Sequence, residues 1–260
     1  MNQLANRVAL ITGAGRGIGR AIAIAYAAEG AKVALTARSK GELEEVVGRI
    51  RDAGGAALAF LADLGDRAVP QKVVDDVQRA LGPVEILVNN AGVGSSSNPR
   101  PVVEFDDDFW DRTLAINLTA PYLLCKAVLP GMLARRWGRI ITIASVNGKI
   151  GSLHGAAYAA SKHGVLGLTR TLAMEVAGQG IAVNAICPGP VHTVMNDRRI
   201  EYDAKRRGVP VKDLEAGLTP IGRRLEPEEI APLAVYLASD AAAAVVGQAI
   251  NVDGGVLMTG

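Results

Sequence analysis

Cysteine and histidine are scarce in this chain. It has two cysteines, Cys125 and Cys187, and three histidines. The sequence contains no CxxC pair and no His/Cys group at metal-ligand spacing, so we expect neither a disulfide framework nor a metal site. Two isolated cysteines are typical of packed thiols in a reducing compartment.

Excess charge and long apolar runs are also missing. The formal net charge is +2 over 260 residues, and the basic residues are scattered apart from short clusters such as Lys205 to Arg207. That distribution argues against a nucleic-acid-binding surface. The first residues have no basic segment followed by a signal-type apolar core, and no later run reaches about 18 apolar residues. We therefore expect a cytoplasmic protein that binds neither nucleic acid nor a membrane.

Short apolar segments alternate with longer segments of helical period along the chain. Residues 7–12, 32–38 and 138–145 are typical of the apolar kind. Strands with helices between them predict a parallel sheet covered by helices on both faces. About seven strands and six helices fit one doubly wound α/β domain, a Rossmann fold. The prediction is a single domain over residues 1–260.

Residues 193–222 break this rhythm. The segment is long and polar, is interrupted by glycine and proline, and follows the sixth predicted strand. Because open α/β sheets bind ligands beyond the carboxyl ends of their strands, we expect a substrate lid here. The alternative is a surface excursion without a function. Its basic residues, Lys205 to Arg207, would suit an acidic carrier protein or a CoA phosphate, or would only face solvent.

A glycine-rich turn joins the first predicted strand to the first predicted helix. Gly13, Gly17 and Gly19 allow the backbone to approach a pyrophosphate at the helix N-terminus, where free N–H groups and the helix dipole favour an anion. Glycines alone are weak evidence, but their place after the first strand predicts a dinucleotide site.

The end of the second predicted strand indicates which dinucleotide binds. Ala37 stands where an NAD-binding protein has an acid, Arg38 follows it, and Arg16 lies inside the glycine turn. Arginine binds a 2′-phosphate that a carboxylate would repel. The residues favour NADP(H), with NAD(H) possible; a solvated surface charge is the alternative for Arg38.

Tyr158 and Lys162 lie four residues apart in a predicted helix. Their side chains therefore share one face and can enter one pocket. Taken alone, such a pair also occurs by chance on many amphipathic helices.

Together these motifs resemble the short-chain dehydrogenase/reductase family over essentially the whole chain. The TGxxxGxG motif is Thr12 to Gly19, the NNAG motif is Asn89 to Gly92, and Ser145 precedes the YxxxK tyrosine by thirteen residues. The resemblance implies a catalytic tetrad of Asn117, Ser145, Tyr158 and Lys162. The dinucleotide contacts that it and the arginines above predict are Gly13, Arg16, Gly17, Ile18, Gly19, Arg38, Asp63, Leu64, Asn90, Ala91, Gly92, Tyr158, Lys162, Pro188, Gly189, Val191 and Thr193.

Hydride transfer at a carbon that bears oxygen also requires a proton to move on that oxygen. Tyr158 takes this proton role, and Ser145 donates a hydrogen bond to the substrate oxygen. A free tyrosine has a pKa of about 10, and a cation about 4 Å away is expected to lower it, which is the role given to Lys162. The resemblance adds that Lys162 bonds the nicotinamide ribose and that Asn117 positions a water in a proton relay.

The substrate is less well defined. His154 lies between Ser145 and Tyr158, so it joins them as a candidate substrate contact, a surface loop histidine being the alternative. The segment between Gly92 and Asn117 looks a few residues longer than in the family's fatty-acid reductases, and it borders the substrate side. That departure puts the substrate in doubt and not the chemistry.

The sequence thus predicts NADPH-dependent reduction of a small-molecule ketone to a secondary alcohol, most like the 3-oxoacyl-[acyl-carrier-protein] reductases. The resemblance implies a homotetramer. One alternative is an NAD-dependent dehydrogenase that oxidises a secondary alcohol, a 3-hydroxy acid or a polyol. Another is a non-catalytic nucleotide-binding sensor, which would be expected to lack a member of the tetrad.

Overall fold

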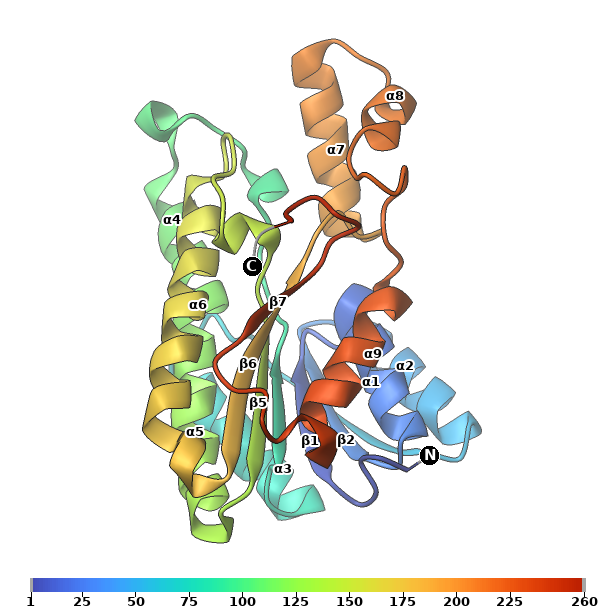
Figure 1. Cartoon of the computed structure of the whole chain (residues 1–260), viewed down its shortest axis with the longest axis vertical. Coiled ribbons are helices and arrows are strands. Elements are labelled where there is room, and N and C mark those ends of the chain that lie inside the picture. Colours follow the sequence, from blue (N-terminus) through green and yellow to red (C-terminus); the bar gives the residue numbers. More distant parts are fainter. Residues whose placement is uncertain (1, 259–260) are drawn as a thin grey trace.

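A computed structural model describes residues 2–258 of the chain, and it is built around one central sheet (Figure 1). The sheet has seven strands in the order β3-β2-β1-β4-β5-β6-β7, and every neighbouring pair is parallel. The predicted Rossmann fold with a seven-stranded parallel sheet is confirmed. The strands are β1 (Val8–Thr12), β2 (Lys32–Ala37), β3 (Ala56–Leu61), β4 (Ile86–Asn89), β5 (Gly138–Ile143), β6 (Ile181–Pro188) and β7 (Ala249–Val252).

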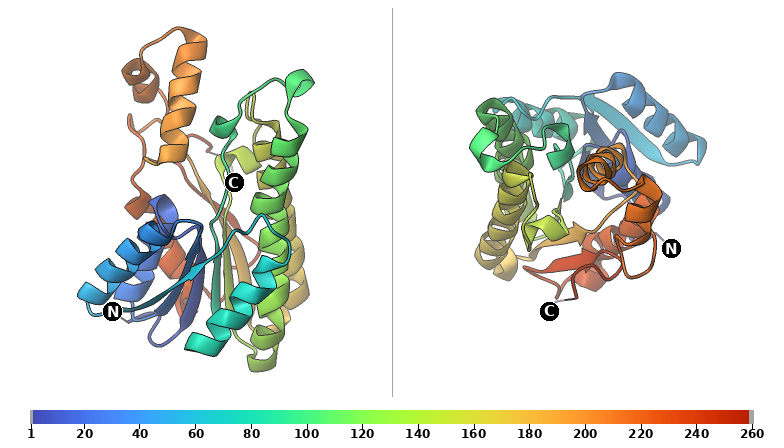
Figure 2. Two further views of the ribbon diagram at one scale, coloured as in Figure 1. Left: turned by 180° about the vertical axis from the view of Figure 1, so that it is seen from behind. Right: turned by 90° about the horizontal axis from the view of Figure 1, so that it is seen from above.

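Helices cover both faces of the sheet (Figures 1 and 2). Residues 2–258 form nine α-helices where the sequence pattern predicted about six, because the lid contributes two and one long apolar stretch divides in two. One face carries α1 (Gly17–Ala28), α2 (Lys40–Asp52) and α9 (Pro227–Ala238). The other carries α3 (Val69–Leu81), α4 (Asp107–Leu114), α5 (Ala120–Arg135) and α6 (Ala156–Val176), and α7 (Val194–Arg207) and α8 (Val211–Ala216) lie within residues 193–222, the segment predicted to be a lid.

The central strands are largely apolar along their length because helices cover both faces of the sheet. All residues of β5 and of β6 are buried, as expected for strands between two helical layers. One hydrophobic core lies between the sheet and α1, α2 and α9, and a second lies between the sheet and α3, α5 and α6. In the first core Tyr26 is fully buried, and its hydroxyl donates to the carbonyl oxygen of Ala234 at 2.9 Å.

The strand order reverses between β1 and β4. β1 pairs with β2 on one side and with β4 on the other, so the loops after β1 and β4 leave the sheet beside each other. Such a switch point is where open α/β sheets bind ligands. The glycine turn follows β1 and the NNAG motif ends β4, which brings both predicted binding segments to this point.

One continuous helical stretch, Asp107–Arg135, is long and apolar enough to cross a membrane by length and composition alone. In this fold it packs against α3 and α6 and supplies side chains to the second core, so it is a core helix. Asp106 caps its N-terminus, and the Asp106 carboxylate accepts from the N–H of Phe109 at 3.0 Å. A five-residue π-helical turn, Ala115–Thr119, joins α4 to α5. Turns of this kind occur frequently at functional sites.

Candidate active site

The four predicted catalytic residues come from three elements that meet at the carboxyl edge of the sheet. Asn117 lies in the π-helical turn, Ser145 follows β5, and Tyr158 and Lys162 occupy the first two turns of α6. Asn117, Ser145 and Lys162 are buried, and Tyr158 is half-buried. The tetrad that the sequence predicted is therefore assembled in one place.

Asn117 is fixed by three hydrogen bonds. Its Oδ1 accepts from the N–H of Val93 at 2.8 Å, and its Nδ2 donates to the Val93 carbonyl at 2.9 Å and to Ser161 Oγ at 3.1 Å. Ser161 Oγ in turn donates to the carbonyl oxygen of Tyr158 at 2.7 Å. Ser161 thus joins the asparagine to the backbone of the tyrosine. Ser161 was not predicted, although it lies three residues after Tyr158 and so falls on the same side of α6.

Burial shifts the pKa values of the pair on α6. Lys162 Nζ lies 5.6 Å from the centre of the Tyr158 ring and donates to the carbonyl oxygen of Ile143 at 2.8 Å. Burial lowers the pKa of Lys162 to about 8. It raises the pKa of Tyr158, a shift that the hydrogen bond from Ser145 opposes. The direction differs from the expected lowering of the Tyr158 pKa, because loss of hydration outweighs the hydrogen bond from Ser145.

The glycine turn is shaped for a phosphate group. The N-terminus of α1 has no side-chain cap and no acid in its first turn, so its N–H groups stay available to an anion. A Cβ added at Gly19 would lie 2.3 Å from the carbonyl oxygen of Gly13, and a Cβ at Gly13 would lie 2.8 Å from Ala91 Cα. The Asn90 side chain donates to the carbonyl oxygens of Thr12 and Gly13 at 2.8 and 3.1 Å. Asn90 and Ala91 therefore hold the turn in the close packing that only glycine permits.

The residues predicted at the adenosine end lie on exposed loops. Arg38 follows β2, is exposed, and forms no ion pair with any residue between 2 and 258. Arg16 is paired with Glu42 of α2, with 3.3 Å between Nη1 and Oε1. Asp63 Oδ1 accepts from the N–H of Gly65 at 3.0 Å, which leaves the other carboxylate oxygen for a ligand or for Arg112 at 3.7 Å. Glu42 was not predicted, because its contact depends on how α2 meets the glycine turn.

Several predicted dinucleotide contacts lie at the end of β6 and just after it. Pro188 ends the strand, and the N–H of Gly189 donates to the Val252 carbonyl at 3.0 Å. Thr193 caps α7, since its Oγ1 accepts from the N–H of Asn196 at 3.2 Å. A Cβ at Gly17 would lie 3.1 Å from the Thr193 methyl group. The structure thus brings the start of the lid against the glycine turn. Taken together, the turn, the free helix N-terminus and these loops fit a dinucleotide.

α7 lies beside the loops that follow β4 and β5 (Figure 2). His154 Nδ1 lies 2.6 Å from the Tyr202 hydroxyl on α7. Arg199, also on α7, donates to the Leu153 carbonyl at 2.8 Å and to Ser95 Oγ at 3.2 Å. The sequence did not predict Arg199 or Tyr202, because their partners are close only in space. His154 has a backbone φ of 56°, a left-handed conformation uncommon outside glycine.

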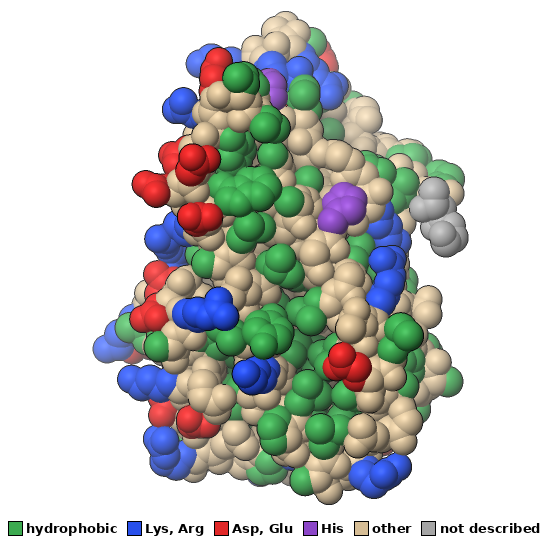
Figure 3. All heavy atoms as spheres, turned by 90° about the vertical axis from the view of Figure 1, so that its left-hand side faces the viewer, with side chains coloured by type: hydrophobic (Ala, Val, Ile, Leu, Met, Phe, Trp, Pro, Cys, Tyr) green, Lys and Arg blue, Asp and Glu red, His purple; other side chains and the backbone are tan. Residues whose placement is uncertain are grey.

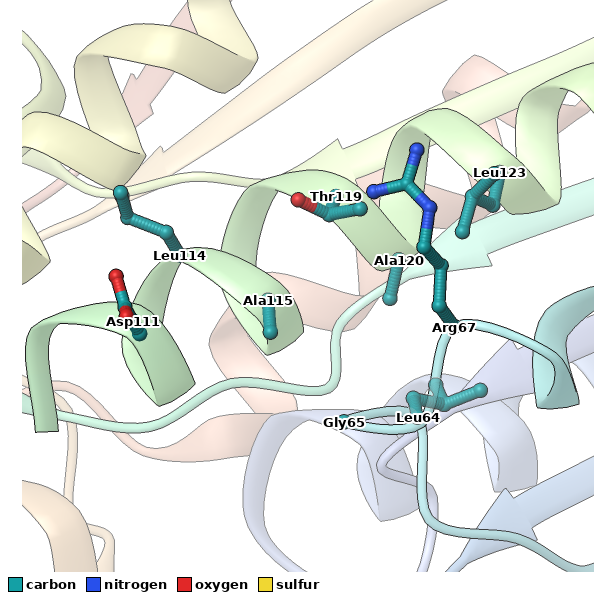
Figure 4. Close-up of a pocket in the computed structure, with 9 residues that line it drawn as sticks. All are labelled: Leu64, Gly65, Arg67, Asp111, Leu114, Ala115, Thr119, Ala120 and Leu123. Atoms are coloured by element: carbon teal, nitrogen blue, oxygen red, sulfur yellow. The ribbon is translucent and has the colours of Figure 1, made fainter. Parts of the chain in front are cut away.

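A separate hollow of about 280 Å³ lies away from the tetrad, where the turn after β3 meets α4 and α5 (Figure 4). None of the four tetrad residues lines it. Its walls are Leu64, Gly65, Arg67, Asp111, Leu114, Ala115, Thr119, Ala120 and Leu123. Among them only Leu64 is a predicted dinucleotide contact, and it is buried beside Asp63.

Known proteins resemble this chain along nearly its whole length. The model of the short chain dehydrogenase family matches residues 7–203. The 3-oxoacyl-[acyl-carrier-protein] reductase of Salmonella typhimurium is 38% identical over 252 residues, which cover 97% of this chain and 98% of that protein. The D-beta-hydroxybutyrate dehydrogenase of Cupriavidus necator is 37% identical over 258 residues, which cover 97% and 98%. A crystal structure of an actinorhodin polyketide ketoreductase variant with NADPH has a TM-score of 0.92 and 39% identity, covering 98% of each chain.

The chain belongs to the short-chain dehydrogenase family. The resemblance drawn from its motifs is confirmed. The protein is an NAD(P)-dependent oxidoreductase of the kind that acts on CH–OH groups and ketones.

Proposed function

We propose that the protein reduces a ketone to a secondary alcohol with NADPH, with a substrate of the 3-oxoacyl-thioester type. The observation that carries this proposal is the environment of Tyr158. Its half-buried side chain lies beside Ser145, and burial raises its pKa. The phenol therefore carries its proton near neutral pH, and the hydrogen bond from Ser145 offsets part of the rise in pKa that would make it a weaker donor.

Each tetrad residue has a role that follows from its position. The bound dinucleotide supplies the hydride. Tyr158 donates its hydroxyl proton to the substrate oxygen, and Ser145 donates a hydrogen bond to the same oxygen and fixes the carbonyl. Lys162, whose pKa of about 8 lies near working pH, readily gives up a proton to restore that of Tyr158. Asn117, held by Val93 and Ser161, keeps the helical turns that carry these groups in register.

NADP(H) is the preferred cofactor in this proposal. The end of β2 presents Arg38 without an ion-pair partner among residues 2–258, and Ala37 leaves that end without an acid. A guanidinium group binds a phosphate through two hydrogen bonds. The similar ketoreductase whose structure contains NADPH supports the same preference.

The second candidate is oxidation of a secondary alcohol or a 3-hydroxy acid with NAD. The similarity to the D-beta-hydroxybutyrate dehydrogenase favours it, and the same tetrad runs the reaction in either direction. Cofactor choice discriminates between the two proposals.

The test is steady-state oxidation of NADPH and NADH, measured in parallel against a panel of ketones that includes an acetoacetyl thioester. We expect turnover with NADPH on at least one ketone and little turnover with NADH. Turnover only with NADH would overturn the proposed cofactor and promote the dehydrogenase. Tight dinucleotide binding without turnover on any ketone or alcohol would overturn the enzymatic proposal and support a sensor.

We also propose a homotetramer, in which the face formed by α4, α5 and α6 is covered by another subunit. Hydrophobic side chains gather on this face (Figure 3). Tyr122 of α5 is 42% exposed and Met174 of α6 is 86% exposed. Sedimentation equilibrium tests the proposal: a mass of four chains supports it, and a monomer at micromolar concentration contradicts it.

A further inference from the structure

We propose that Glu42 is a specificity-determining residue, which weakens the preference for the 2′-phosphorylated dinucleotide by competing with the phosphate for Arg16. The inference rests on the proposed function for the identity of the cofactor. It adds a residue of this chain that opposes the two arginines.

Glu42 lies directly against the glycine turn. Its Oε1 is 3.3 Å from Arg16 Nη1. A Cβ added at Gly15 would lie 2.9 Å from Glu42 Cβ, 3.0 Å from its Oε2 and 3.7 Å from Ala37 Cβ. The carboxylate therefore occupies the angle between the glycine turn and the end of β2. In this fold the residue at the end of β2 contacts the ribose that carries the 2′ group.

The start of α2 holds this carboxylate in place. Ser39 is the N-cap, and its Oγ accepts from the N–H of Glu42 at 3.4 Å. An acid in the first turn of a helix is stabilised by the helix dipole. The two other glutamates of this helix pair with bases of the helix itself, since Glu44 lies 3.6 Å from Lys40 and Glu45 lies 2.7 Å from Arg49. Among the three glutamates, Glu42 is the one that contacts the glycine turn.

A carboxylate at this position affects the two cofactors differently. The Glu42 carboxylate offsets the positive charge of Arg16 and repels the two negative charges of a 2′-phosphate. Binding of NADP must therefore displace the carboxylate or overcome that repulsion. An uncharged ribose hydroxyl meets no such repulsion and can donate a hydrogen bond to a carboxylate. Arg38, which has no ion pair among residues 2–258, still attracts the phosphate. The chain thus has one arginine, Arg38, that is available to the phosphate and another, Arg16, that is paired with Glu42.

Glu42→Gln removes the charge and keeps the shape of the side chain. Glu45→Gln is the matched control, since Glu45 belongs to the same helix and its ion pair lies outside the cleft. Because an exposed ion pair is weak, we expect Glu42→Gln to tighten NADP⁺ binding by roughly three- to tenfold and to leave NAD⁺ binding within about twofold. The gain should shrink at high salt, which screens exposed charges.

Isothermal titration calorimetry of the wild type and both variants measures this directly, with NADP⁺, NAD⁺ and adenosine 2′,5′-bisphosphate as ligands at low salt. Tighter binding of the two 2′-phosphorylated ligands by Glu42→Gln alone supports the inference. Unchanged or weaker binding of them, an equal gain for NAD⁺, or the same gain in Glu45→Gln overturns it. A wild-type protein that binds neither dinucleotide overturns the proposed function, and the inference with it.

Discussion

Lys162 gives a quantitative prediction about stability that does not depend on any substrate. Burial lowers its pKa in the folded protein from 10.5 to about 8. Between these two values the unfolded chain holds a proton that the folded protein has released. Because stability rises with pH wherever the unfolded state binds more protons, this lysine increases the free energy of unfolding from about pH 8 up to about pH 10.5. Lys162→Met removes that contribution.

The size of the effect follows from the shift. Each pKa unit corresponds to about 1.4 kcal/mol of unfolding free energy. At about pH 9.5, which is roughly one and a half units above the folded pKa, the free energy of unfolding has risen by about 2 kcal/mol. At about pH 6.5 both states are protonated, so the buried ammonium exerts its full penalty and none of this gain has been reached. The stability of the wild type minus that of Lys162→Met should therefore be about 2 kcal/mol more favourable at the higher pH.

Urea unfolding of both proteins at the two pH values measures this difference. Lys72→Met is the control, because Lys72 is exposed on α3 and surface substitutions usually change stability by less than about 0.5 kcal/mol. If the difference between the wild type and Lys162→Met is the same at both pH values, the ammonium of Lys162 is not desolvated in the folded protein. The account of the α6 pair would then be wrong.

Three further changes test other parts of the structure. Gly19→Ala places a Cβ 2.3 Å from a backbone oxygen, so calorimetry should show that NADP⁺ binding is weakened by at least roughly tenfold. Gly48→Ala is the control and should bind normally, because its Cβ meets nothing within 4 Å. Equal affinities of the two variants would contradict the close packing of the turn. Tyr202→Phe removes the 2.6 Å hydrogen bond between α7 and the loop opposite, and hydrogen exchange of α7 amides should accelerate roughly fivefold; unchanged exchange would show that this bond does not hold the lid. Ser161→Ala leaves the Asn117 amide without one of its hydrogen-bond partners, so kcat should fall roughly tenfold while the NADP⁺ affinity is unchanged. An unaltered kcat would refute a positioning role for Ser161.

The sequence predicted the fold well because its signals are local and regular. Seven apolar segments separated by helical ones leave few arrangements other than a parallel sheet with helices on both faces. The number of helices was underestimated. The polar lid has no sustained apolar period from which α7 and α8 could be predicted, and the π-helical turn that separates α4 from α5 leaves no mark in the composition.

The meeting of the four tetrad candidates and the close packing of the glycine turn were predictable, because each residue stands in a motif at fixed spacing; their catalytic roles stay predictions. Contacts between segments that are distant in the sequence were not. Arg16 and Glu42, or His154 and Tyr202, meet only when the chain has folded. The direction of the Tyr158 pKa shift depends on how deeply the pair is buried, which spacing alone does not reveal. The substrate role of the lid, the homotetramer and the cytoplasmic location stay predictions.

The central claim is that Tyr158 delivers a proton while a hydride reaches the carbonyl carbon of a ketone. The most direct measurement incubates the enzyme with acetoacetyl thioester and NADPH deuterated at the transferred position, and analyses the product by mass spectrometry. The account predicts a 3-hydroxy product with one deuterium on the carbinol carbon. It also predicts no product from Tyr158→Phe that still binds NADPH. A deuterated product formed at the wild-type rate by Tyr158→Phe would contradict the account.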